Sequence, residues 1–292
     1  MSVDLLQEKI RKMKNPSIVD MTASADMIPQ CVFEEHAGFL QAYYAFCREI
    51  LGSLANVVPA VRFRFSNFSL LGPEGLSVLQ ECLGFASKLG YYVLLDCVDI
   101  LSPMVARQAA QTLFSDESLW QFDGLIVSTY IGSDGLKPFV KLLADSPKGL
   151  YGVVRSGNKS AAELQDLFTG NRLSHTAAAD LVNRLGEPLA GRSGYNRIGA
   201  MAGAASADGL RVLRSKYSRL FLILDGYDYP NANAKNCSFA FDKFGHGACA
   251  IAGTSVTCAW SQAESDGRDF VALAVSACER MKKNLTRYTT IL

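Results

Sequence analysis

The sequence predicts a (β/α)8 barrel, of the TIM type, in a single domain that spans residues 1–292. Eight short apolar segments of strand length alternate with helical patterns over nearly the whole chain, and no linker interrupts them. Alternation of this kind predicts parallel βαβ units, and eight units favour a closed barrel. An open doubly wound sheet is the alternative. It would need a glycine-rich turn after its first strand, and none follows Met21.

Each expected element follows from its apolar pattern. The expected strands are runs of apolar residues at 17–21, 57–65, 92–97, 124–127, 150–155, 198–202, 220–224 and 248–252. The expected helices have apolar residues at helical spacing and lie at 1–15, 39–54, 75–89, 103–114, 135–144, 161–168, 175–185, 207–216 and 270–288. The helix at 1–15 precedes the first strand and is therefore an addition to the barrel. We interpret 171–195 and 225–244 as insertions at loops.

The composition argues against several classes of protein, namely nucleic-acid-binding, membrane-associated and disulfide-rich proteins. The 29 basic and 28 acidic residues leave a formal net charge of +1, so we expect no binding to nucleic acid or to a membrane surface. The first segment lacks the apolar centre of a signal peptide, and no apolar run is long enough to span a membrane. The eight cysteines are scattered without a C-x-x-C pair. We therefore expect reduced thiols in a cytoplasmic protein, without a disulfide framework or a metal site.

Charged residues at two strand ends are the first candidates for a functional site. The strand at 92–97 ends in Asp96, and Asp99 follows three residues later. Arg62 and Arg64 alternate with aromatic residues near the end of the strand at 57–65. Barrel enzymes carry their catalytic groups at the carboxyl ends of their strands. We expect one of the two arginines to face this end and to pair with an aspartate.

Several motifs, in their order and spacing, resemble the orotidine 5′-monophosphate decarboxylase family, in its longer bacterial branch. The matching segments run along essentially the full chain and are V-P-A-V at 58–61, Y-I-G-S-D-G-L-K-P-F at 130–139, E-L-Q-D-L at 163–167, S-G-Y at 193–195 and I-G-A-M-A-G-A at 198–204. The resemblance implies a (β/α)8 barrel that works in pyrimidine nucleotide biosynthesis, converting orotidine to uridine monophosphate. It also implies a carbon–carbon lyase that uses no cofactor.

The residues that carry this reaction in the family do not match. The family uses a D-x-K-x-x-D motif after the third strand, and Asp96 matches its first aspartate. An ungapped alignment places Val98 at the lysine and Leu101 at the second aspartate. A two-residue deletion instead matches Asp99 to the second aspartate. We prefer the deletion, and the lysine is missing in both alignments.

A second lysine, which the family carries on its second strand, becomes Arg62 here. Arginine keeps the positive charge, but it stays protonated at any working pH and is therefore a poor proton donor. The aspartate that ends the family's first strand, in a G-L-D motif, becomes Thr22. The turn that contacts the pyrimidine, T-S-N in the family, reads Ser156-Gly157-Asn158.

The segments that resemble the family's phosphate site are altered as well. The family holds phosphate with a loop after the seventh strand and an arginine after the eighth. Asp225 and Asp228 lie in the first segment. The second segment reads Gly253-Thr254-Ser255-Val256, in which Val256 takes the arginine's place and the three residues before it can still donate hydrogen bonds. A carboxylate beside a phosphate dianion is unfavourable. We therefore expect weak phosphate binding at a degenerate pocket.

Three functional hypotheses follow. The favoured one is a pseudoenzyme, a barrel of this family that has lost decarboxylation and persists in a binding or regulatory role. The second is an enzyme of altered chemistry, whose acidic mouth binds a metal or a cationic, non-phosphorylated ligand through Asp96, Asp99, Asp225 and Asp228. The third is a divergent decarboxylase that is still active.

The resemblance also implies a homodimer. Members of the family usually associate through the barrel mouth, and the second aspartate of the motif then reaches into the partner's site. Asp99 is the residue that would do so here. A heterodimer with an active paralogue, to which this chain lends Asp99, is a further possibility that the sequence leaves open.

Overall fold

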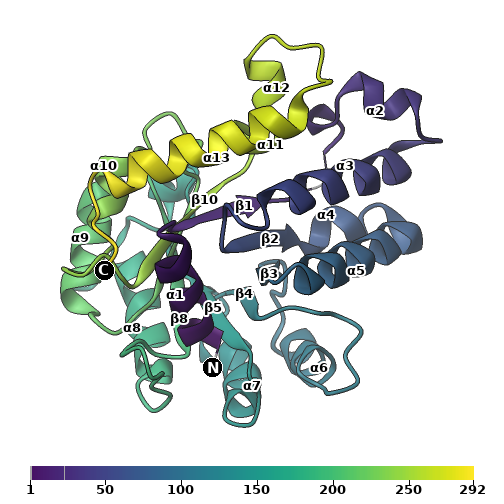
Figure 1. Cartoon of the computed structure of the whole chain (residues 1–292). Coiled ribbons are helices and arrows are strands. Elements are labelled where there is room, and N and C mark those ends of the chain that lie inside the picture. The colour runs from purple at the N-terminus through teal and green to yellow at the C-terminus, as the bar shows by residue number, and fades with distance from the viewer. Residues whose placement is uncertain (1, 23) are drawn as a thin grey trace.

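The computed structural model describes residues 2–22 and 24–292 and has a closed barrel of eight parallel strands (Figure 1). The barrel strands are β1 (Ser17–Asp20), β2 (Ala60–Arg64), β3 (Tyr92–Asp96), β4 (Gly124–Ser128), β5 (Gly149–Val153), β8 (Ile198–Gly203), β9 (Leu222–Asp225) and β10 (Ala248–Ala252). They are paired in chain order, and β10 closes the barrel by pairing with β1. The predicted (β/α)8 barrel is confirmed.

Helices surround the strands. The longer ones are α3 (Phe39–Leu54), α5 (Gly72–Lys88), α6 (Pro103–Leu113), α7 (Ser133–Leu143), α8 (Ser174–Gly186), α9 (Ala207–Lys216) and α13 (Phe270–Thr286). Short helices lie in the connections: η1 (Ala25–Met27), α2 (Gln30–Glu34), α4 (Phe65–Ser69), η2 (Lys159–Glu163), α10 (Ala234–Ser238), α11 (Thr254–Thr257) and α12 (Ala259–Gln262). In the part of the chain that the structure describes, no helix is both long and apolar enough to cross a membrane.

The prediction of a helix at 161–168 is wrong. Only the 3-10 helix η2 forms there, and Phe168 begins a hairpin in which β6 (Phe168–Thr169) pairs antiparallel with β7 (Arg172–Leu173). Gly170 and Asn171 make its two-residue turn, and Gly170 has a φ of +68°. A Gly-Asn pair is typical of such a turn because glycine adopts positive φ without strain. This signal in the sequence favoured a hairpin over a helix.

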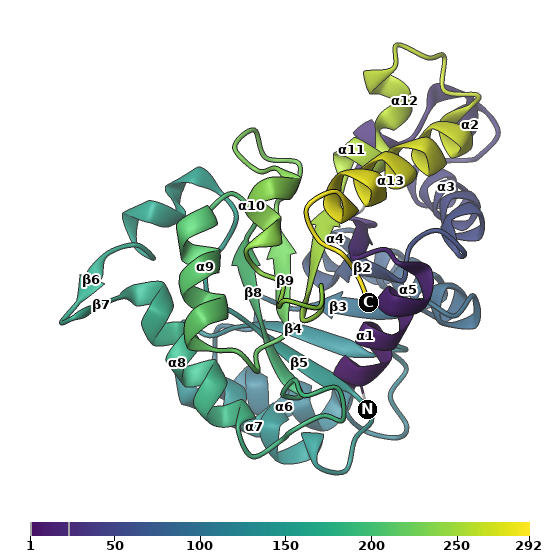
Figure 2. The same cartoon turned by 60° about the vertical axis from the view of Figure 1, so that its left-hand side comes forward.

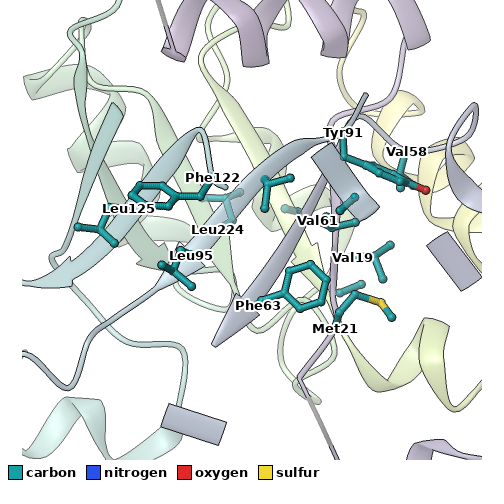
Figure 3. Close-up of a cluster of buried hydrophobic side chains, with 14 of the residues drawn as sticks. Val19, Met21, Val58, Val61, Phe63, Tyr91, Leu95, Phe122, Leu125 and Leu224 are labelled. Atoms are coloured by element: carbon teal, nitrogen blue, oxygen red, sulfur yellow. The ribbon is translucent and has the colours of Figure 1, made fainter. Parts of the chain in front are cut away.

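Side chains alternate between the barrel interior and the helical layer along each strand. Figure 3 shows part of the outer layer, including Val61, Phe63 and Leu95, which pack between strands and helices. Their neighbours in the chain, such as Ala60 and Leu94, belong to the interior cluster. The same alternation directs the residues at the carboxyl ends of β1, β2, β3 and β9 toward the barrel mouth.

Helix α1 (Ser2–Met13) lies across the opposite end of the barrel from the mouth (Figure 2). It corresponds to the helix predicted at 1–15, and the first residue of that prediction, Met1, lies outside the described residues. Its side chains Val3, Leu6 and Ile10 are fully buried in the interior cluster. Ser2 Oγ is hydrogen-bonded to Tyr92 Oη, which is 2.9 Å from Tyr151 Oη. The helix thus covers this end of the barrel, and the mouth is the accessible end.

We predict that Leu6→Ala lowers the free energy of unfolding by about 2–5 kcal/mol, because it removes a fully buried side chain and leaves a cavity. Urea titration followed by circular dichroism measures the change. Glu8→Ala, on the exposed face of the same helix, is the matched control and should stay within about 0.5 kcal/mol of the unchanged protein. Equal effects of the two substitutions would show that α1 is not part of the core.

Candidate functional site

Arg62 lies at the centre of the barrel mouth, surrounded by carboxylates from three other strands. Its Nη2 atom is 2.5 Å from Asp20 Oδ2 on β1, and its Nη1 atom is 2.8 Å from Asp225 Oδ1 on β9. The same Nη1 atom is 3.6 Å from Asp96 Oδ2 on β3. Arg62 is 4% exposed and Asp96 is completely buried. The strand alternation brings these four side chains together, because each is an inward-facing residue at or near the end of its strand.

Arg64 supplies a second cation. Its Nε and Nη2 atoms both lie 3.2 Å from Asp96 Oδ2, and about a third of its side chain is exposed. The other oxygen of Asp96 accepts a hydrogen bond from the backbone N–H of Val98 at 3.2 Å. Both oxygens of Asp96 are therefore engaged by the protein itself. Arg62 and Arg64 both face the mouth, whereas we expected one of them to do so.

The electrostatics of the cluster fix the charge of Arg62. Burial lowers the pKa of Arg62, but Asp20, Asp225 and Asp96 together raise it well above its ordinary value. Burial raises the pKa of Asp20, and the attraction of Arg62 outweighs it, so that this pKa lies below its ordinary value. For Asp96, burial dominates over the two guanidinium groups, and its pKa is raised. Arg62 is therefore a permanent cation held by anions, and it does not release its proton.

Asp20 is a site residue that the sequence analysis did not identify. The resemblance assigned the end of the first strand to Thr22, but Asp20 is the residue that contacts Arg62. Thr22 lies beside it, and its hydroxyl donates to Asp20 Oδ1 at 2.8 Å. Counting alternate residues back from the end of the strand would have placed Asp20 on the same face as the buried Ile18.

A cavity of about 350 Å³ lies above this cluster. The described residues that line it are Asp20, Thr22, Ser24, Asp26, Met27, Arg62, Arg64, Asp225, Gly226, Asp228, Tyr229, Ile251, Gly253, Thr254, Thr257 and Cys258. Among them, Arg62 and Arg64 are the only cations, and both are bound to aspartates. The described part of the lining contains no lysine or histidine that could act as a proton donor.

Asp228 makes contacts unlike those of the other aspartates. Its Oδ2 atom accepts hydrogen bonds from the backbone N–H groups of Gly253, at 2.6 Å, and of Ser255, at 3.3 Å. Its Oδ1 atom accepts a hydrogen bond from the Ser255 hydroxyl. Thr254 lines the cavity beside these groups, and Val256 is buried in the outer core. The donors that we expected at Gly253 and Ser255 are present, and a carboxylate of the same chain occupies them.

The loop after β5 is held by its own side chains. Ser156 Oγ donates to Asn158 Oδ1 at 2.6 Å, and Gln165 exchanges hydrogen bonds with the backbone and hydroxyl of Ser156. Asn158 lines a separate cavity of about 410 Å³, and Tyr229 borders both this cavity and the mouth cavity. A Cβ atom at Gly157 would lie 2.8 Å from the Tyr229 ring. Glycine at 157 therefore allows Tyr229 to pack against this loop.

The predicted acidic mouth does not form as one cluster. Asp96 and Asp225 meet at Arg62, and Asp228 binds the segment after β10. Asp99 is exposed and lines a different, largely apolar cavity of about 440 Å³. Within the described ranges, no group of three or more histidine, cysteine, aspartate or glutamate side chains is arranged to hold a metal ion. Asp96 and Asp225 are instead engaged by arginines, and Asp228 by backbone N–H groups, so these contacts do not support the metal version of the hypothesis.

The closed parallel barrel, with charged side chains converging at the carboxyl ends of its strands, places the chain in the class of (β/α)8 barrels. No family model matches the chain. It is 32% identical to the orotidine 5′-phosphate decarboxylase of Rhodopirellula baltica over 211 residues, which cover 71% of this chain and 70% of the relative. It is 22% identical to the decarboxylase of Clostridium novyi over 286 residues, 98% of each chain. The chain belongs to the orotidine 5′-phosphate decarboxylase family.

Solved structures agree on the fold. The orotidine 5′-monophosphate decarboxylase of Plasmodium berghei matches with a TM-score of 0.78 and 12% identity, covering 98% of each chain. The OMP decarboxylase of Leishmania donovani matches with a TM-score of 0.72 and 21% identity, covering 97% of this chain and 98% of the other. These identities establish a shared barrel.

We predict that Arg62→Met lowers the free energy of unfolding by about 3–5 kcal/mol at pH 7, because it leaves buried carboxylates without their shared cation. Arg62→Lys keeps the charge and should be affected less. Arg268→Met removes an exposed arginine with a 3.7 Å contact to Asp266 and serves as the control, with a change below about 1 kcal/mol. Urea titration measures all three, and equal stability of Arg62→Met and Arg268→Met would contradict the buried cluster.

Proposed function

We propose that this chain is a decarboxylase-inactive member of its family, a pseudoenzyme that keeps a binding or regulatory role. The observation that carries the proposal is the position of Arg62, which stands where the resemblance places a family lysine and is held by Asp20, Asp96 and Asp225. A cytoplasmic setting is part of the proposal, and the eight free cysteines fit a reducing compartment.

The chemistry of decarboxylation explains why this arrangement supports inactivity. Loss of carbon dioxide from a pyrimidine ring leaves a carbanion, and a proton must reach it from a group whose pKa is matched to the task. Arg62 has a pKa raised well above an already high value, so it retains its proton. Among the described residues that line the mouth cavity, no other basic side chain except Arg64 is available.

Asp96, which matches the first aspartate of the family motif, is held in ion pairs. The resemblance implies that carboxylates near the family's lysine press on the substrate's carboxylate, and Asp96 matches one aspartate of that motif. Here the charge of Asp96 is balanced by Arg62 and Arg64, and its two oxygens are hydrogen-bonded or ion-paired. A paired carboxylate repels a substrate carboxylate weakly. The contacts of Arg62 and Asp96 thus support the loss of the proton donor and a weakened repulsion by Asp96.

We predict no turnover of orotidine 5′-monophosphate above background, measured by the loss of its ultraviolet absorbance. The expected kcat/KM lies well below the ~10⁴ M⁻¹ s⁻¹ at the low end of ordinary enzymes. The protein should be produced in a host that lacks its own decarboxylase. The Rhodopirellula baltica relative, assayed identically, shows that the assay can detect activity.

Asp96→Asn distinguishes true activity from contamination in this assay. Turnover in the unchanged protein that Asp96→Asn abolishes would overturn the proposal and favour a divergent but active decarboxylase. Turnover that Asp96→Asn leaves intact would come from a contaminating enzyme, and the proposal would stand.

We further propose a homodimer through the barrel mouth, with a heterodimer with an active paralogue as the alternative. Large apolar side chains are exposed on the connections that follow β2, β3 and β5: Leu70 (86% exposed), Leu101 (61%), Met104 (65%), Leu164 (72%) and Phe168 (76%). Asp99 lies between Cys97 and Leu101 in the same connection as two of them. These segments all follow the carboxyl ends of barrel strands, and exposed apolar side chains at that end fit an association surface there.

We predict that the purified chain sediments as a dimer and that Met104→Asp shifts it toward monomer by burying a charge at the contact. Val212→Asp, at an exposed apolar residue on α9, is the control and should not change the sedimentation coefficient. A monomer at every concentration would contradict the homodimer and direct the search to a partner protein in the native cell.

A further inference from the structure

Asp228 occupies the position at which barrels of this class commonly bind phosphate. That position is formed by the loops after the seventh and eighth strands, which are β9 and β10 here. Asp228 follows β9, and the three groups that donate hydrogen bonds to it belong to Gly253 and Ser255, which follow β10. These donors therefore bind an oxyanion, and that oxyanion is a carboxylate of the chain itself.

The loop that carries Asp228 is fixed by backbone hydrogen bonds. Tyr227 N–H donates to the carbonyl of Ile251 on β10 at 3.1 Å, which ties the loop to the neighbouring strand. Tyr229 N–H donates to the carbonyl of Gly226 at 3.0 Å, closing a turn in which Gly226 has a φ of +78°. Glycine permits this turn, because residues with a side chain rarely adopt such a φ. This hydrogen-bonded turn therefore directs Asp228 at Gly253 and Ser255.

The charges around the cavity also oppose the binding of a phosphate. Carboxylates of Asp20, Asp26, Asp225 and Asp228 line it, and they outnumber the guanidinium groups of Arg62 and Arg64. Both arginines are already paired with aspartates. A phosphate dianion that entered would lose its hydration, meet no unpaired cation among the described lining residues, and lie against a carboxylate of like charge.

We propose that Asp228 is a specificity-determining residue that takes the place of a ligand's phosphate, so that the mouth cavity accepts nucleosides and excludes nucleotides. The proposal rests on the proposed function in one respect, since it takes the barrel mouth as the binding site. Hydroxyl groups of a ribose can donate to the cavity carboxylates, whereas a phosphate cannot. The chain would thus bind the unphosphorylated counterpart of a pyrimidine nucleotide.

The test is calorimetric titration of uridine 5′-monophosphate and uridine into the unchanged protein and into Asp228→Ala. The unchanged protein should bind the nucleotide no more tightly than uridine. Asp228→Ala frees the donors and removes the like charge, so its affinity for the nucleotide should rise by at least about tenfold while its affinity for uridine changes little. Thermal unfolding confirms that the variant is folded. If Asp228→Ala does not fold, Asp228→Asn, which keeps the shape of the side chain and removes its charge, takes its place in the titration.

Two further variants separate a specific contact from a general effect of charge. Asp26→Asn neutralises an exposed carboxylate that lines the same cavity but does not occupy the donors of Gly253 and Ser255, and it should raise nucleotide affinity by much less than Asp228→Ala does. Adding Ser255→Ala to Asp228→Ala removes one of the freed donors and should reverse part of the gain.

Three results would overturn the proposal: tight nucleotide binding by the unchanged protein, no gain in a folded Asp228 variant, or an equal gain in Asp26→Asn. The absence of a gain in a folded Asp228 variant would leave the proposed loss of decarboxylation intact, because that loss depends on Arg62. Conversely, turnover of orotidine 5′-monophosphate would refute the inactivity whatever the Asp228 variants show.

Discussion

The buried guanidinium of Arg62 is the constraint on which the mouth of this barrel depends. A cation that is 4% exposed requires anions close by, because removing a charge from water without compensation is very unfavourable. The barrel supplies them from β1, β3 and β9, whose inward-facing carboxyl-terminal residues converge on the same point. Arg64 adds a second cation beside Asp96. These ion pairs hold the carboxyl ends of the four strands together at the mouth.

This mutual compensation has a functional consequence. An active site of this kind needs charges that are balanced only when the substrate or transition state is present. Here the charged groups are balanced by the chain: Asp96 by arginines, Arg62 by carboxylates, and the donors of Gly253 and Ser255 by Asp228. The barrel retains the form of its family and a cavity at the mouth. Its polar groups are directed at each other, which supports the proposed loss of decarboxylation.

The fold could be predicted from the sequence because it depends on repeated, local patterns. Eight apolar runs alternating with helices defined the barrel, whereas the hairpin at Gly170 and Asn171 was missed because the apolar spacing after Ala161 was given more weight than its turn signal. The site was predicted in part. Arg62, Asp96 and Asp225 were named, but Asp20 was not, since the resemblance favoured Thr22. The contact of Asp228 with Ser255 depends on how two loops meet, which no local pattern encodes.

Carbon-detected nuclear magnetic resonance of the aspartate carboxyl groups, followed as a function of pH, tests the central claim most directly. If the Arg62 cluster exists, Asp20 titrates below its ordinary value of 3.8 because Arg62 stabilises its anion, and Asp96 titrates above 3.8 because burial dominates. Arg62→Met should then move the titration of Asp20 upward. Ordinary titration of both carboxyl groups, unaffected by Arg62→Met, would contradict a mouth organised by this buried guanidinium.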